Sequence, residues 1–518
     1  MRAIWAEIFL LAIFPQFTAA AVLVGVIAWF LRLQIDKDFK LRSLPFDMPI
    51  TIFVILGAIS VFMSPVRNFD LIYNYCEIMG IFILSYLLIG QNIRTTAQVQ
   101  SLTTAIAVTA ALVVFGGFFQ YFFGVDTSEI KITDIDALSG MYTRIFSTFE
   151  TPNALAGFLD VIICLALGLL AKFGTTKQKL IILAAIVLLT LCLAMTYSRG
   201  AFLAITAIFV IYGIFYDLRI LIFFMAGAAI LLYENTILLE RVLSVFTEND
   251  PVNGLRIGIW VSTISMIADH PFIGIGWGAY QFIYPQYNYY LVDTTQIIYH
   301  AHNLFLQTAA EVGIAGALAY FWYFFGTMFL AWNLNANERY SKMKTAAGRI
   351  AQRAKDSTFK QKFDEELVKT FAESKFLQNL AQIKSMFILR ASETINQIFD
   401  KVSRTEKKSK SNTQVKTEKK SEAELVHHEE MKFDANNKKT DDKNSDDDKF
   451  DVQKFAEDTT AESDAQFVDG IRLGIGLAFL SMALNGLSDD LLFNVPSAIF
   501  MWILGALAAA IEENSHAD

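Results

Sequence analysis

The segment Tyr299-His300-Ala301-His302-Asn303-Leu304 brings together two of the chain's six histidines and an amide, directly before a long apolar stretch. Imidazole changes its protonation state near neutral pH, so it can take the proton of a hydroxyl group during a group-transfer reaction. Glu311, further along the same stretch, or Glu150 could assist. The segment is a candidate active site in which either His302 or His300 is the base. A histidine that only caps the following helix is the competing interpretation.

Two arginines stand in polar segments that border apolar stretches. Arg199 lies in Thr196-Tyr197-Ser198-Arg199-Gly200, and Arg256 precedes Trp260 by four residues. A guanidinium group offers a fork of donors that fits phosphate oxygens and stays charged at any working pH. These segments are therefore candidate phosphate sites. For Arg199 the alternative is an interface anchor that extends to the lipid headgroups.

The composition indicates which elements must position these residues. Hydrophobic residues make up 54% and charged residues 18% of the 518 positions. Apolar runs long enough to cross about 30 Å of hydrocarbon as helices recur along the chain. The sequence therefore predicts an all-α polytopic membrane protein with eleven transmembrane helices, or twelve if residues 3–31 form a hairpin broken at Pro15. The other expected spans are 48–64, 70–90, 101–123, 153–171, 179–196, 201–216, 219–233, 304–332, 469–487 and 492–511.

Short loops rich in lysine and arginine resist translocation and mark the cytoplasmic side. Residues 32–42, Arg94 and residues 172–179 carry such charges. Counting spans from these loops places 125–151 and 234–302 outside the cell, where 234–303 would form a helical loop domain. The expected organisation is an N-terminal bundle 1–233, the loop 234–303, a span 304–332, a cytoplasmic insert 333–468 and two C-terminal spans in 469–518.

The insert 333–468 differs in composition from the rest of the chain. Its first half has apolar residues at helical spacing, whereas its second half is highly charged and nearly free of aliphatic residues, so we expect it to be partly helical and then disordered. His427-His428 lacks further ligands at a defined spacing, and the three cysteines fall within spans, where core packing is expected. No metal or cofactor site is expected. The net charge of −8 argues against nucleic-acid binding.

Several motifs occur in a fixed order along the chain. Together they resemble the O-antigen ligase and polymerase superfamily, over roughly residues 140–332 and more loosely the last two spans. Each motif alone is weak, but the joint pattern is specific. The motifs are Ser198-Arg199-Gly200, Arg256-x-x-x-Trp260, His270-Pro271-x-x-Gly274-x-Gly276 and His302-Asn303 followed by Gly313-x-x-Gly316.

The resemblance implies an inverting, metal-independent glycosyltransferase in the bacterial inner membrane, with its active site on the periplasmic side. Its donor would be a glycan on undecaprenyl diphosphate. Its acceptor would be a hydroxyl of lipid A core, a growing polysaccharide or a protein. The roles implied are diphosphate binding by Arg199 and Arg256 and proton removal by His302. From their places in the polar segments, we expect Arg144 to join the diphosphate site and Asn303, Asn153 and Ser198 to support it. The insert is not part of the pattern.

The sequence leaves the acceptor open among O-antigen ligase, slightly favoured, polymerase and protein O-oligosaccharyltransferase. The loop 279–298 is rich in tyrosine, which could stack on sugars or lie at the membrane interface. A lipid-linked oligosaccharide flippase or another transporter is the alternative from a different class. Such a protein would need polar groups near the bilayer midplane. Asp160 is the clearest one, whereas most polar groups gather in outer loops.

Overall fold

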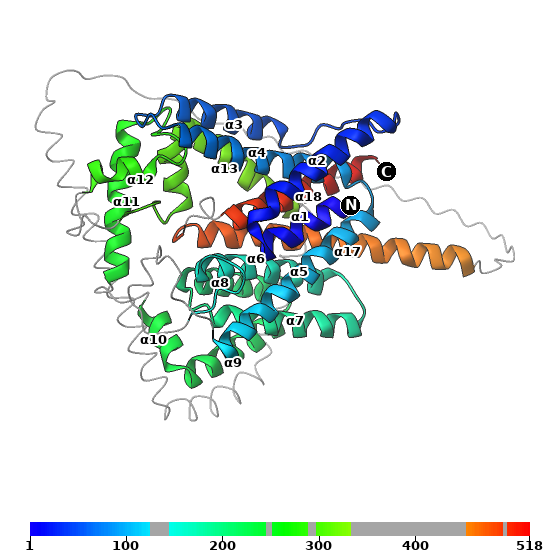
Figure 1. Ribbon diagram of the computed structural model, residues 1–518. Helices are drawn as coiled ribbons and strands as arrows, with labels where there is room; N and C mark the ends of the chain where they lie inside the picture. Colours follow the sequence, from blue (N-terminus) through cyan, green and yellow to red (C-terminus); the bar gives the residue numbers. More distant parts are fainter. Residues whose placement is uncertain (125–143, 245–250, 289–296, 333–451, 490–494, 518) are drawn as a thin grey trace, which may run out of the picture. The chain divides into compact units, whose positions relative to one another are not determined.

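The computed structural model describes residues 1–124, 144–244, 251–288, 297–332, 452–489 and 495–517, and within these ranges it contains helices and no strand (Figure 1). Contacts divide the chain into two compact units, of which the first comprises Met1–Tyr340 and Ala456–Asp518 and the second Ser341–Phe455. The candidate site lies in the first unit. Most of the expected insert, 333–451, lies outside the described residues.

The helices follow the expected apolar stretches closely. Residues 452–468, at the end of the expected insert, are the exception, because the helix that leads into the next-to-last span already begins at Val452. The elements are α1 (Arg2–Ile13), η1 (Pro15–Phe17), α2 (Thr18–Ile35), α3 (Asp47–Phe62), α4 (Phe69–Asn92), α5 (Thr96–Phe123), α6 (Pro152–Lys172), α7 (Thr176–Ala194), α8 (Arg199–Phe215), α9 (Leu218–Glu234), α10 (Thr236–Ser244), α11 (Pro251–Asp269), α12 (Tyr280–Ile283), η3 (Tyr284–Tyr287), α13 (Leu304–Trp332), α17 (Val452–Asn485) and α18 (Val495–Ala517).

The chain is an all-α polytopic membrane protein. Among the described residues, eight helices are long and apolar enough to cross a membrane, and α3 and α8 are shorter apolar helices. The expected number of eleven or twelve is reached only if α1 and α9 are counted as well. Those two helices have 12 and 17 residues.

The first apolar stretch forms a hairpin and not a single span. α1 ends at Ile13, η1 begins at Pro15, and α2 packs back against α1. Proline cannot donate the backbone hydrogen bond that would continue the first helix, so the chain breaks there. The 12 residues of α1 span about 18 Å, which is short of the hydrocarbon thickness, as expected for this arm.

The core forms where α18 packs between α4 and α13. Trp502 of α18 stacks on Tyr323 with ring centroids 4.6 Å apart and on Phe82 at 5.8 Å. Glycines allow α6 and α17 to approach closely, since a Cβ added at Gly168 would lie 2.3 Å from the backbone nitrogen of Gly474. Small residues permit such contact between helices in a membrane. These contacts fix α17 and α13, the two helices whose ends form the site.

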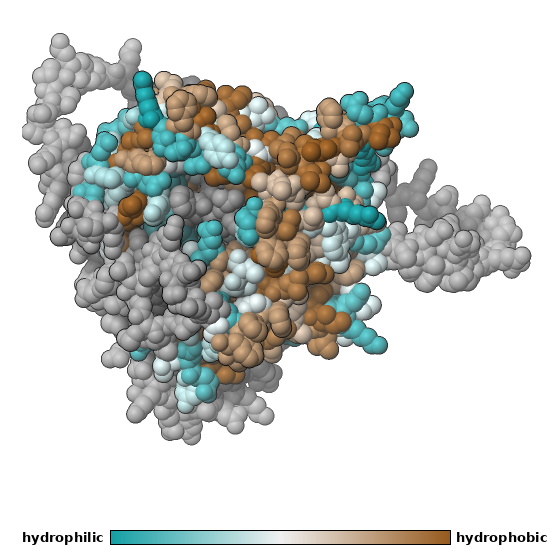
Figure 2. Space-filling view, viewed as in Figure 1, coloured by the Kyte–Doolittle hydropathy of each residue, from teal (hydrophilic) through white to brown (hydrophobic). Residues whose placement is uncertain are grey.

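Basic residues gather at one end of the bundle. Arg42 donates hydrogen bonds to the carbonyls of Gly90 and Ile93, while the guanidinium groups of Arg32 and Arg94 lie 4.2 and 4.0 Å from the ring centroid of Phe39. These are the residues that the charge rule assigns to the cytoplasm. Hydrophobic side chains cover much of the middle of the visible face (Figure 2).

α13 is broken inside the bundle at Gly313, whose φ is +72°. The turn after α11 fills the break: Ile275 and Gly276 donate backbone hydrogen bonds to the carbonyls of Ala310 and Glu311, and Ile314 donates to Pro271. A Cβ on Gly313 would lie 2.4 Å from the carbonyl oxygen of Phe272. The glycine is required here, and the break fixes α11 against the first turns of α13.

Candidate active site

The loop before α13 is held by hydrogen bonds on both sides. Asn303 caps the helix, because its Oδ1 accepts hydrogen bonds from the backbone N–H groups of Phe305 and Leu306 at 3.0 Å each. Ala301 donates its N–H to Gln307 Oε1 at 2.7 Å and accepts from Trp260 Nε1 of α11 at 3.1 Å. The cap is therefore Asn303. The interpretation of His302 as a capping residue does not hold.

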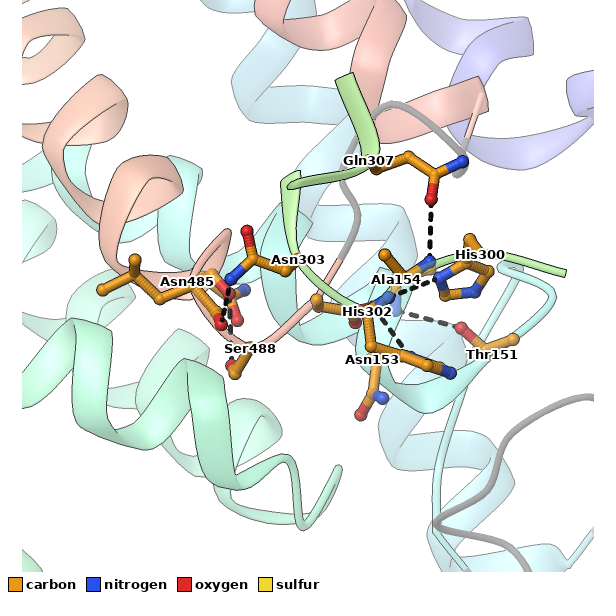
Figure 3. A network of polar contacts seen from close by, with 12 residues as sticks. Thr151, Asn153, Ala154, His300, His302, Asn303, Gln307, Asn485 and Ser488 are labelled. Carbon is orange, nitrogen blue, oxygen red and sulfur yellow. Dashed lines mark hydrogen bonds and ion pairs between the residues drawn. The ribbon is translucent and has the colours of Figure 1, made fainter. Parts of the chain in front are cut away.

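The two histidines lie against each other and against a carboxylate. Their ring centroids are 4.1 Å apart, and the backbone N–H of His302 donates to His300 Nδ1 at 3.3 Å (Figure 3). His302 Nδ1 lies 3.8 Å from Asp489 Oδ1. Asp489 follows α17, so the cluster links the end of α17 to the loop before α13. The carboxylate can hold the orientation of the His302 ring.

The charges of this cluster are strongly coupled. Burial, and next the neighbouring His302, lower the pKa of His300 to about 3; Asp489 opposes this shift and Arg256 adds to it. For Asp489, burial raises the pKa, but the polar contact with His302 and the electrostatic interactions with His302, His300 and Arg256 together bring it below its usual range. At neutral pH His300 is therefore uncharged and Asp489 is ionised.

The segment after α17 connects the starts of α13 and α8. Leu304 donates its N–H to the carbonyl of Gly486 at 2.8 Å, and Asn303 Nδ2 donates to the carbonyl of Leu487 at 3.0 Å. A Cβ added at Gly200 would lie 2.2 Å from Ser488 Oγ. In Figure 3, Asn303 lies on the side of Asn485 and Ser488. The segment therefore brings the Arg199 turn next to the histidine loop.

Arg199 is the first residue of α8 and is only 5% exposed. A buried guanidinium does not fit the interpretation as an anchor that extends to the membrane interface. Ser198, buried beside it, makes no side-chain hydrogen bond that caps the helix. Helix N-termini carry partial positive charge. The start of α8 is thus an electropositive position inside the protein.

Arg144 holds the shape of the site from a neighbouring loop. Its Nε donates to the carbonyl of Thr196 at 2.8 Å and its Nη2 donates to Asn153 Oδ1 at 2.7 Å. The turn before α8 and the start of α6 are thereby tied together. Two of the guanidinium donors of Arg144 therefore make hydrogen bonds within the protein. In Figure 3, Thr151 caps the start of α6, because its Oγ1 accepts a hydrogen bond from the N–H of Ala154.

Arg256 lies on α11 and acts electrostatically on both His300 and Asp489. α11 also supplies Trp260, which holds the histidine loop. The helix itself is fixed by α13, as described above. The polar segments of Arg144, Arg199, Arg256 and His302 are therefore brought together.

Glu311 is placed differently from the histidines. Its Oε1 accepts a hydrogen bond from the backbone N–H of Gly278 at 2.9 Å, and its carbonyl accepts from Gly276 at 3.0 Å. It lies seven residues into α13, about 10 Å along the helix from Leu304. These contacts give Glu311 a role in holding the turn after α11 to α13.

The tyrosines of loop 279–298 that the structure describes point into the protein. Tyr280, Tyr284 and Tyr287 are buried. The hydroxyl of Tyr280 lies 2.7 Å from Thr263 Oγ1, and Tyr287 donates to Asp269 Oδ2 at 2.8 Å. These side chains attach α12 and η3 to α11, so they are not free to stack on sugars. Tyr289 and Tyr290 lie outside the described residues.

Backbone strain is concentrated around the site. Among the described residues, the non-glycine residues with positive φ are Ser147 at 53°, Tyr197 at 52° and His302 at 49°. Each lies in one of the loops that converge here. Left-handed conformations are costly for bulky residues and persist where the surrounding contacts impose them, often at functional sites. For His302, this conformation sets the direction in which the ring leaves the chain.

Asp489 was not among the residues predicted from the sequence. A signal was present: in the sequence, Ser488-Asp489-Asp490 stands between the last two expected spans, and the expected topology places this segment on the same side as the histidines. The cysteines also differ from expectation in part, since Cys164 and Cys192 are buried but Cys76 is exposed.

The fold and the site define an all-α membrane protein with a buried cluster of arginine, histidine and aspartate at one end. Residues 184–321 match the family model described as O-antigen ligase, from within α7 into α13. Over this segment the chain is similar to the O-antigen ligase family, which confirms the expected resemblance. The match contains Arg199, Arg256, His300 and His302, whereas Asp489 lies beyond it. A search of curated proteins finds no match.

Proposed function

We propose that this protein transfers a glycan from undecaprenyl diphosphate to an acceptor hydroxyl, with inversion at the anomeric carbon, and that the acceptor is lipid A core. The family match already indicates a membrane glycosyltransferase of the O-antigen ligase type. The observation that carries the finer proposal is that the start of α8, with the buried Arg199, packs at Gly200 against Ser488, the neighbour of Asp489 in the His302–Asp489 pair. The buried arginine suits the binding of a diphosphate, and the His302–Asp489 pair suits the removal of a proton from a hydroxyl.

Arg199 and Arg256 hold the diphosphate in this proposal. Negative charge grows on the leaving diphosphate as the bond between its oxygen and the anomeric carbon breaks. Fixed cations and a helix N-terminus stabilise that charge without reorganisation. Arg144 keeps the turn before α8 in place through Thr196 and Asn153. Because the protein supplies these charges itself, we expect transfer to proceed without a divalent metal ion.

His302 accepts the proton of the acceptor hydroxyl. The hydroxyl oxygen forms a bond to the anomeric carbon, the bond to the diphosphate oxygen breaks, and the electron pair leaves with the diphosphate. Asp489 faces Nδ1 of His302, which leaves Nε2 for the acceptor and stabilises the imidazolium that forms. Attack opposite to the leaving group accounts for inversion. Ser198, Asn153 and Asn303 support the loops that hold these groups.

The orientation expected from the basic loops supports an extracytoplasmic site. The basic cluster around Phe39 belongs to the end expected in the cytoplasm. The loops that form the site come from segments expected on the other side. We therefore propose that the protein lies in the bacterial inner membrane with its active site facing the periplasm.

The transporter alternative finds less support. Asp160 is buried within α6, and Ser481 of α17 donates to its Oδ2 at 3.5 Å, which ties two helices of the core together. A binding site for transport would be expected near the bilayer midplane. The large polar cluster lies instead at the helix ends, which favours an enzyme that acts on a lipid headgroup.

The banding pattern of lipopolysaccharide from a deletion strain tests the acceptor. Loss of all polymer from the core supports a ligase. Cores that carry a single repeat indicate a polymerase, and unchanged bands indicate a protein or another acceptor. Complementation with the wild-type chain must restore the bands, and complementation with His302→Ala must not.

A further inference from the structure

His300, His302 and Asp489 form a set of potential metal ligands. One ligand atom from each residue lies within 4.8 Å of the others. Imidazole and carboxylate groups are the ligands that Zn²⁺ and related transition metals accept in proteins. Three protein ligands with an open fourth position is also the arrangement of a metal site that exchanges with solvent.

A second observation points to the same place. Nδ1 of His302 is buried and has no hydrogen-bond partner among the described residues, and it faces Asp489. A buried polar atom without a partner commonly marks the position of a water molecule or an ion. The side chain of Asp489 is 23% exposed, so a small cation can reach the cluster from solvent.

We propose that His300, His302 and Asp489 bind a divalent transition metal ion such as Zn²⁺, and that the bound ion inhibits glycan transfer. Binding follows from the cluster itself. Inhibition rests on the proposed function, because a metal-bound His302 cannot accept the proton of the acceptor. The ion is thus a regulator of the reaction and not a participant in it.

The geometry sets the expected selectivity. Ligand atoms around a tetrahedral Zn²⁺ ion lie about 3.4 Å apart, so side-chain rotations must close the cluster by about an ångström. Mg²⁺ prefers six oxygen ligands and should bind poorly to two imidazoles. Arg256 repels a cation from this position, so the affinity should be lower than that of a structural zinc site.

Direct binding is measured on the purified full-length chain without a histidine tag. The background carries His427→Ala and His428→Ala, since this adjacent pair is a separate source of zinc affinity. In calorimetry we expect saturable Zn²⁺ binding to this background and none with Mg²⁺. Adding His300→Ala or Asp489→Ala should weaken it at least tenfold, whereas the control His270→Ala should not. Equal Zn²⁺ affinity in the background and in both cluster variants would overturn the site.

A thermal measurement covers the case in which a cluster variant folds poorly. A ligand that binds only the folded state raises the melting temperature. The background protein should therefore melt at a higher temperature in Zn²⁺ than in Mg²⁺. Equal melting temperatures in the two ions would also count against the site.

The activity arm separates this proposal from the proposed function. Transfer by the background protein should fall when Zn²⁺ is added and return after chelation. The His300→Ala variant should need at least tenfold more Zn²⁺ for the same fractional inhibition, measured against its own metal-free rate. Zn²⁺ binding to the cluster without inhibition would overturn the regulatory part and count against His302 as the base. Transfer with no Zn²⁺ binding would overturn only the metal site and leave the proposed function intact.

Discussion

Nδ1 of His302 lies 3.8 Å from Oδ1 of Asp489, although the two residues stand on opposite sides of the insert in the sequence. The end of α17 positions Asp489. The loop before α13 positions His302, and hydrogen bonds of Asn303, Trp260 and Gln307 hold this loop in place. The pair therefore depends on packing between α13 and α17 and not on either loop alone.

The two arginines proposed for the donor should not tolerate lysine. Arg199→Lys or Arg256→Lys keeps the charge but removes the two-pronged donor geometry, so we expect transfer to fall roughly 10- to 100-fold. The measurement is glycan transfer in membranes with matched protein levels. Arg219→Lys is the control, since Arg219 is exposed on α9 and pairs with Asp217. Wild-type rates for both variants would show that the arginines do not bind the donor.

The two histidines should differ in their effect on transfer. His302→Ala should lower the rate by about 10²–10⁴-fold while the donor still binds, because only proton removal is lost. His300→Ala should leave measurable activity, and His270→Ala, at the end of α11, serves as the control. Rates should be measured beside donor binding for each variant. An inactive His300→Ala with an active His302→Ala would assign the base to His300, and activity in both would exclude base catalysis by this loop.

Asp489→Asn keeps the shape of the side chain but removes the charge that faces His302. We expect the turnover number to fall by about 10²-fold, with little change in donor binding, because the imidazolium formed in the reaction loses its partner. Asp36→Asn, at the other end of the bundle, should leave transfer unchanged. Turnover of Asp489→Asn at the wild-type rate would show that the contact at 3.8 Å has no part in the reaction.

Much of this arrangement could be predicted from the sequence, since membrane spans and their order follow from apolar length and basic loops. α8 begins at Arg199 and α13 at Leu304, close to the expected starts, so the polar segments were placed at one end. Lipid leaves the backbone few options except helix, which makes such assignments robust.

The contacts that hold the site could not be read in the same way. Asp489 pairs with a residue far away in the chain, and short acidic loops between spans usually face water. The left-handed backbone of His302 and the break at Gly313 have no periodic signal. The tyrosines fold inward because Tyr280 and Tyr287 find partners on α11, which depends on how η3 packs.

The stability of the protein should depend on pH through His300. Its pKa in the folded state is lowered to about 3 from an ordinary value of 6.5, so between these values the unfolded chain binds the proton more readily. Stability is then fully present above pH 6.5 and falls as the pH drops toward 3. Asp489 adds little above pH 4, because it is ionised in both states there. We expect the melting temperature in detergent to fall between pH 6.5 and 4.5, and to fall less in His300→Gln than in wild type or in His270→Gln. Identical slopes in all three would show that His300 is not buried uncharged.

The break in α13 should be intolerant of any side chain at Gly313. Alanine there would have to adopt a φ of +72° and would place its Cβ 2.4 Å from the carbonyl oxygen of Phe272, so the turn after α11 must shift. The strain and the lost hydrogen bonds from Ile275 and Gly276 should cost on the order of 2 kcal/mol or more. Gly227→Ala on α9 is the matched control, because a Cβ there meets nothing within 4 Å and alanine favours the helix. Melting temperature and transfer should both fall in Gly313→Ala and stay level in Gly227→Ala. If Gly313→Ala melts and transfers like wild type, the break does not fix α11, and the placement of Arg256 and Trp260 must come from other contacts.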